Sequence, residues 1–168
     1  MYKGQTGEFI ELTNVGNTAV DMTSWSYDDN KRTPGVFDLS DFGTVQPGQS
    51  VIITDTTQTQ FRSHWSLDPS VKIIPNLGNP SGENLGRDDE INIYDSSGQL
   101  VDRLTYADEG VAGGPRTSSV SGNILYDNLG QNNAPSAVLS YINDSFGSYQ
   151  SSAGDIANPG TYYIASEK

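Results

Sequence analysis

The chain has 168 residues, no cysteine and a formal net charge of −12, from nine basic and 21 acidic side chains. This length suits one domain, which needs no covalent staple because folding buries about two-thirds of its unfolded surface. The missing cysteines exclude disulfides and thiolate chemistry, and the acidity disfavours nucleic acid, whose phosphates it would repel.

Hydrophobic periodicity predicts β-strands through the first two-thirds of the chain. Residues 8–13 combine alternation with β-forming side chains, and the polar stretch at 14–17 supplies a turn after them. Further strands are expected at residues 20–27, 51–54, 91–94 and 100–106. The turn-forming residues 95–98 join the last two as a β-hairpin.

One segment has a helical pattern instead. Residues 56–65 lack Gly and Pro, open on capping residues and place Phe61 and Trp65 four positions apart. This spacing predicts a short helix that lays an aromatic face over a sheet. Both Trp65 and Trp25, which alternates like a core residue, are expected in the core.

The composition changes near residue 110 to Gly, Ser, Asn and Ala with weak periodicity. The sequence therefore predicts a β-sandwich core over residues 1–108 and a loop-rich extension over 109–168, packed on the same domain. Short strands are expected at 138–142 and 162–164. Six aromatic side chains between residues 126 and 163 argue against disorder, which is usually poor in aromatics.

Catalytic motifs are absent from the sequence. His64 is the single histidine, so every Ser-His-Asp arrangement would have to use it, and no Gly-x-Ser-x-Gly motif or P-loop occurs. Asp88 and Glu90 would lie about 7 Å apart on a strand, a spacing compatible with glycoside hydrolysis. Nothing else in the sequence indicates a sugar-binding cleft, so we expect no enzymatic activity.

Acidic clusters at strand ends are the remaining candidate site. Calcium binds six to eight oxygen ligands, many of them from loops. No cofactor is expected, and a calcium ion is the alternative. Its candidate ligands are Asp28, Asp29, Asp88, Asp89, Glu90 and Asp108. Residues 144–155 have the length of an EF-hand loop, but Tyr149 stands where that loop requires Gly.

Four stretches resemble the lamin-tail domain family, in the branch found in bacterial exported proteins. They are EFIELTNVGNTAVDMTSW, FDLSDFGTVQPGQSVIIT, NLGRDDEINIYDSSGQLVDRLTY and, for the bacterial ending, GSYQSSAGDIANPGTY. The resemblance implies an all-β, immunoglobulin-like β-sandwich with one short helix and a loop-rich C-terminal extension.

The same resemblance implies a non-catalytic binding or attachment module that meets a protein or a cell surface. The resemblance alone implies an extracellular, cell-surface or periplasmic location. The sequence itself gives no sign of export, because residues 1–9 show no signal peptide. No apolar run approaches the roughly 20 residues of a membrane span. The alternatives are an accessory domain of an exported nuclease or phosphoesterase, and a calcium-dependent binder of carbohydrates or surfaces.

Overall fold

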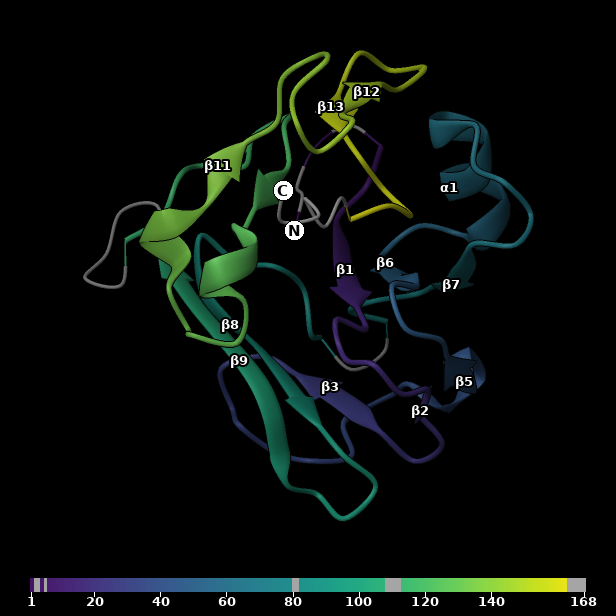
Figure 1. Ribbon diagram of the computed structural model, residues 1–168, viewed down its shortest axis with the longest axis vertical. Helices are drawn as coiled ribbons and strands as arrows, with labels where there is room; N and C mark the ends of the chain where they lie inside the picture. Colours follow the sequence, from purple (N-terminus) through teal and green to yellow (C-terminus); the bar gives the residue numbers. More distant parts are fainter. Residues whose placement is uncertain (2–3, 5, 80–81, 108–112, 163–168) are drawn as a thin grey trace.

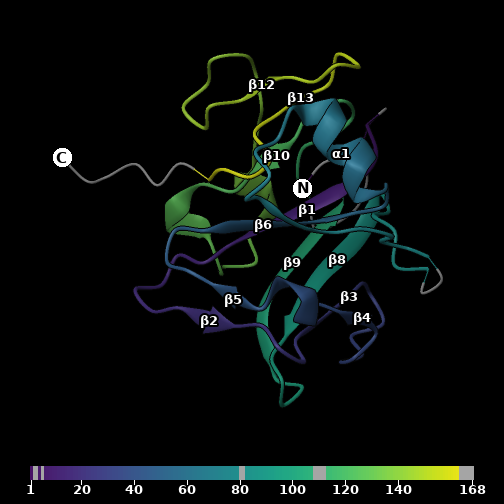
Figure 2. The ribbon, with the colours of Figure 1, turned by 90° about the vertical axis from the view of Figure 1, so that its right-hand side faces the viewer.

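The computed structural model describes residues 1, 4, 6–79, 82–107 and 113–162. Two β-sheets face each other across a shared apolar layer (Figure 1 and Figure 2). In spatial order, the first contains β1 (Phe9–Thr13), β6 (Ser50–Thr54) and β7 (Lys72–Ile74). The second contains β4 (Phe37–Asp38), β3 (Ser26–Asp28), β8 (Asp88–Tyr94) and β9 (Leu100–Ala107). The architecture confirms the predicted all-β sandwich.

The helix α1 (Gln58–Trp65) connects β6 to β7, which are paired in parallel. Thr57 caps its first turn by accepting a hydrogen bond from the backbone N–H of Gln60. Phe61 and Trp65 are buried and pack against Phe9 of β1, with ring centroids 5.3 Å and 6.1 Å away. The predicted aromatic face is confirmed, and Trp65 is a core residue.

The sheet of β1, β6 and β7 is buried on both faces. Ile10, Val51 and Ile53 point into the layer between the two sheets, whereas Phe9 and Ile52 lie under α1. A strand covered on both sides needs apolar residues at consecutive positions. This explains why the apolar part of β6 runs without alternation.

The segment at residues 20–27, predicted as one strand, is two. β2 (Val20–Asp21) pairs with β5 (Thr44–Val45), and β3 then begins at Ser26 in the other sheet. Between them Ser24 has a left-handed backbone with φ of 60°, so the chain turns from one partner to the next. The 3₁₀ helix η1 (Ser40–Phe42) inserts Phe42 into the core.

The extension lies along one end and one side of the sandwich (Figure 1). Its elements are β10 (Gly122–Asn123), η2 (Tyr126–Asn128), η3 (Ala134–Ser136), β11 (Val138–Leu139), β12 (Tyr149–Gln150) and β13 (Ile156–Ala157). The strand expected at 138–142 forms over two residues. At 162–164, Tyr162 is outside any strand and the other two positions lie outside the described residues.

Long-range contacts join the extension to the core. The ring of Tyr149 lies 5.7 Å from that of Trp65, and its hydroxyl donates to the Trp65 carbonyl at 2.8 Å. Asp155 accepts a hydrogen bond from the backbone N–H of Thr6 at 3.0 Å. Among the described residues, no helix has the length and apolar character that crossing a membrane requires.

Candidate functional site

A cluster of three buried carboxylates lies at the end of β3. Asp28 is the last residue of that strand, Asp29 follows it, and Glu83 arrives from the loop before β8. One carboxylate oxygen from each lies within 4.8 Å of the others. Asp28 and Asp29 were predicted as ligands, but Glu83 was not, because it is an isolated acid 54 positions from Asp29 in a Gly-rich loop.

Hydrogen bonds fix the geometry of this cluster. Glu83 accepts from the Asp29 backbone N–H at 3.0 Å and from Lys31 Nζ at 2.7 Å. Asp28 Oδ2 accepts from the Thr33 N–H at 2.7 Å. The other oxygen, Asp28 Oδ1, is buried without a hydrogen-bond partner, and the residue is 0% exposed. A buried carboxylate oxygen without a donor is costly unless a proton or a cation meets it.

The pKa values of the three carboxyls reflect this crowding. Burial, followed by the neighbouring Glu83 carboxylate, raises the pKa of Asp29 to about 6. Burial also raises the pKa of Asp28. Burial acts the same way on Glu83, but the hydrogen bonds from Lys31 and Asp29 outweigh it and lower the pKa of Glu83. Lys31 forms a direct ion pair with Glu83, and its charge acts more weakly on Asp29 and Asp28.

The spacing of these oxygens is compatible with one shared calcium ion. Calcium–oxygen distances of about 2.3–2.6 Å allow two ligands of one ion to lie up to roughly 5 Å apart. The remaining ligands would have to be backbone carbonyls or water. The side chain of Lys31 is 57% exposed and could swing away.

The other predicted ligands are used differently. Asp88 is exposed on the first residue of β8. Asp89 is buried and accepts hydrogen bonds from the backbone N–H groups of Gly86 at 2.7 Å and Glu90 at 2.9 Å. It thereby closes the turn before β8. Asp108 lies outside the described residues.

Glu90 belongs to a separate ion-pair network on the outer face of the second sheet. Arg32 donates to both of its oxygens, at 2.8 Å and 2.6 Å, and Asn92 donates at 3.1 Å. Arg103 lies 3.8 Å from the same carboxylate. The hydrogen bonds from Arg32, against the opposing effect of burial, lower the pKa of Glu90 to about 2. With its charge already neutralised, Glu90 is a poor metal ligand.

His64, the single histidine of the sequence, was predicted as a surface or packing residue. It lies on α1, where its Nδ1 is 3.3 Å from Ser152 Oγ in the extension. The carboxylate cluster is formed by a different part of the fold.

A groove of about 430 Å³ opens on the side of the sandwich, between β1 and β9. Its lining is mainly apolar and comes from both sheets and from the extension. Prominent lining residues are Leu12, Val20, Trp25, Leu104, Leu129 and Tyr162. Trp25 was predicted in the core; it packs against the core cluster but is only half-buried, and its remaining surface faces the groove.

A two-sheet sandwich with an open apolar groove and loops at the sheet ends defines the class of immunoglobulin-like interaction modules. Residues 1–108 match the model of the lamin tail domain, and the chain therefore belongs to the lamin tail domain family, as its motifs predicted. The family is immunoglobulin-like and non-enzymatic, and it serves interactions. No curated protein matches the chain.

Proposed function

We propose that this chain is a binding and attachment module of an exported or surface-located bacterial protein, where it contacts a protein or surface component without catalysing a reaction. The observation that supports it is the groove between β1 and β9. Apolar surface of this extent, left open beside polar walls, is typical of a binding site.

The experiment measures retention of a fluorescent fusion of the chain on intact bacterial cells, isolated envelopes and purified cell-wall polysaccharides. Val101 is 52% exposed and lines the groove, so Val101→Arg blocks it without disturbing the core. Val138→Arg is the matched control, because Val138 is 37% exposed and does not line the groove. We expect retention that Val101→Arg abolishes and Val138→Arg preserves. No retention on any surface would refute the proposal.

A second candidate function is calcium-dependent binding, supported by the partnerless Asp28 Oδ1 inside the cluster with Asp29 and Glu83. In this proposal Asp28, Asp29 and Glu83 coordinate the ion, and the loops they belong to become ordered for a carbohydrate or surface partner. Lys31 competes with calcium for Glu83, since both neutralise the same carboxylate.

Calorimetric titration with calcium chloride, alongside the melting temperature, tests this. We expect heat and a rise in melting temperature for the native chain, both lost in Asp29→Asn and Glu83→Gln and both increased in Lys31→Met. Asp41→Asn is the control, because Asp41 is an exposed acid on η1. The absence of heat and of a melting shift in the native chain would eliminate calcium as a ligand.

A further inference from the structure

The groove lies between two strands that are each at the edge of a sheet. β1 ends the three-stranded sheet and β9 ends the four-stranded one, and Figure 1 shows them on either side of the same gap. An edge strand exposes a row of backbone N–H and C=O groups that can pair with another strand. Whether each edge is open decides what the groove can bind.

The edge of β9 is already capped. The outward N–H of Thr105 donates to Asn132 Oδ1 at 2.6 Å, and that of Ala107 donates to the Gly113 carbonyl at 2.9 Å. The N–H of Arg103 donates to the side chain of Asp102 at 2.8 Å. Groups from the extension and from β9 itself therefore protect this edge from a further strand.

The edge of β1 is open along its second half. Asp55 donates to the Glu8 carbonyl and Asn14 donates to the Gln49 carbonyl, so the even-numbered residues of this segment direct their backbone groups towards β6. In an antiparallel pair the direction alternates, and the backbone groups of Glu11 and Thr13 therefore face away from β6. Among the described residues they have no hydrogen-bond partner, and both residues line the groove.

Each of the two walls of the groove carries an acidic side chain. Glu11 projects from β1, and its Oε1 is buried without a hydrogen-bond partner, while Oε2 accepts from the Gly160 N–H at 3.2 Å. Burial raises the pKa of Glu11 to about 7, and the opposing effects of Ser50, the N-terminal ammonium of Met1 and the Gly160 N–H only partly offset it. On the opposite wall, Asp102 also lines the groove.

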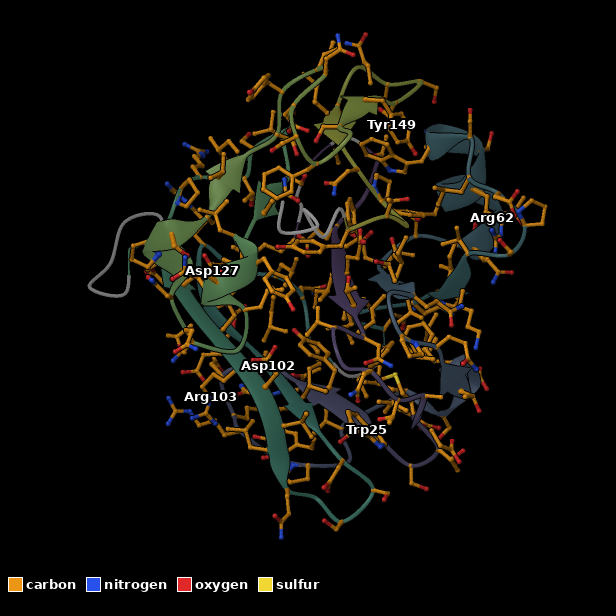
Figure 3. All side chains as sticks on the ribbon, in the orientation of Figure 1. Trp25, Arg62, Asp102, Arg103, Asp127 and Tyr149 are labelled. Atoms are coloured by element: carbon orange, nitrogen blue, oxygen red, sulfur yellow. The ribbon has the colours of Figure 1, made fainter. Side chains whose placement is uncertain are left out.

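The one cation on that wall among the described lining residues points elsewhere. Arg103 lies on the other side of β9 from Asp102, as Figure 3 shows, and donates to Asn92 near Glu90. The floor between the walls is apolar, with Leu12, Trp25 and Leu104. A ligand that fits this surface offers backbone hydrogen bonds, apolar side chains and positive charge together.

We infer that the groove binds an extended segment of a partner protein, with alternating apolar and basic side chains, which adds as a strand to β1 at Glu11 and Thr13. This inference rests on the proposed function and specifies its partner. The apolar side chains of the segment face Leu12 and Leu104, and a lysine or arginine reaches Glu11. A second copy of this chain is a poor occupant, because each copy carries a net charge of −12.

The probe is a fluorescein-labelled peptide of seven residues in which valine and lysine alternate between terminal threonines, measured by fluorescence anisotropy. Two control peptides accompany it. One has glutamate in place of lysine, and the other has methyl groups on alternate backbone nitrogens, which prevents strand pairing on one edge and leaves the side chains unchanged. We expect the first peptide to bind and both controls to bind at least about tenfold more weakly.

Variants of the chain locate the contact. Thr13→Pro removes an outward N–H from an edge strand, a position where proline keeps the pairing with β6. It should raise the Kd at least about tenfold, and Glu11→Gln about fivefold or more through loss of a charge-assisted hydrogen bond. Asp41→Asn should leave the Kd unchanged. The methylated peptide needs no change in the protein, so the test stands even if Thr13→Pro fails to fold.

Equal binding of the methylated and unmethylated peptides would overturn strand addition, as would dimerisation of the chain that competes with the peptide. The same variants in the surface-retention assay separate the two proposals. If Val101→Arg abolishes retention while Thr13→Pro does not, the module binds through its groove but not by adding a strand. If no surface retains the native chain while the peptide binds through β1, the attachment function fails and strand addition stands.

Discussion

Among the described residues, Glu90 is the carboxylate with the most hydrogen bonds from other side chains. These contacts within the protein occupy both of its oxygens, so it is not a good candidate ligand for a metal ion. Its side chain is 7% exposed and receives hydrogen bonds from Arg32, Asn92 and Thr105. Adjacent charges in the sequence Gly-Arg-Asp-Asp-Glu suggest a shared site, but successive strand residues point to opposite faces. The three acids therefore have separate roles: Asp89 closes a turn, Glu90 belongs to the ion-pair network and Asp88 faces solvent.

Glu90→Gln should lower the free energy of unfolding by about 2–3 kcal/mol, since it leaves Arg32 and Arg103 without their carboxylate. The value lies below the usual cost of breaking a buried pair because Arg32 is 55% exposed and regains water. Urea denaturation measures the change. Asp88→Asn, two positions away and exposed, should change it by less than about 0.5 kcal/mol. A similar effect of both substitutions would contradict the assigned network.

Asp29 makes stability depend on pH in an unusual direction. Its pKa is about 6 in the folded chain against an ordinary 3.8, so the folded state binds a proton more tightly than the unfolded state. Unfolding free energy should therefore rise as pH falls from 7 towards 4, by about 1–2 kcal/mol. Glu11, with a folded pKa of about 7, contributes in the same sense.

At lower pH the dependence reverses, and the free energy of unfolding falls as the pH falls. The pKa of Glu90 is lowered to about 2, so its contribution is present above pH 4.5 and is lost as the pH falls towards 2. Stability should have its maximum between about pH 4 and pH 4.5, where the gain from Asp29 ends and the loss from Glu90 begins. Denaturation curves between pH 3 and pH 8 test this, and Asp29→Asn should flatten the rise between pH 6 and pH 4 whereas Asp41→Asn should not.

At the scale of elements, α1 shows how local chemistry and packing combine. Thr57 accepts from the Gln60 N–H and donates to its side chain, and Phe61 and Trp65 anchor the helix on the sheet. Thr57→Ala should lower the free energy of unfolding by about 1 kcal/mol through loss of the cap. Thr59→Ala, on an exposed position of the same helix, should be neutral or slightly stabilising. Equal losses for both would show that the cap contributes nothing.

Elements with strong local patterns were predictable, and those that depend on a distant partner were not. β1, β6, β8, β9 and α1 all follow segments with clear periodicity. β7 has three residues and is a strand because β6 lies beside it, just as β12 and β13 depend on each other. The break at Ser24 was missed because apolar and aromatic residues occur on both sides of it, although the alternation shifts there from even positions to odd ones.

For the whole molecule, the extension should unfold together with the sandwich. Tyr149 and Ala157 share an apolar cluster with Phe61, Trp65 and Ile73. Tyr149→Phe removes the hydrogen bond to the Trp65 carbonyl and should lower the free energy of unfolding by about 1 kcal/mol. Calorimetry should show one transition that moves as a unit. Two transitions, with only one of them shifted, would contradict a single cooperative domain.

The sequence by itself determined the sandwich, the short helix, the family and the acidic character, because periodicity, turn chemistry and charge are local properties of the chain. Only the tertiary structure placed Glu83 beside Asp28 and Asp29, and separated Glu90 from them, since those distances depend on how loops cross between strands. The groove, too, is formed only by the tertiary structure. An open edge at Glu11 and Thr13 opposite a capped edge at β9 exists only when two sheets and the extension are folded together.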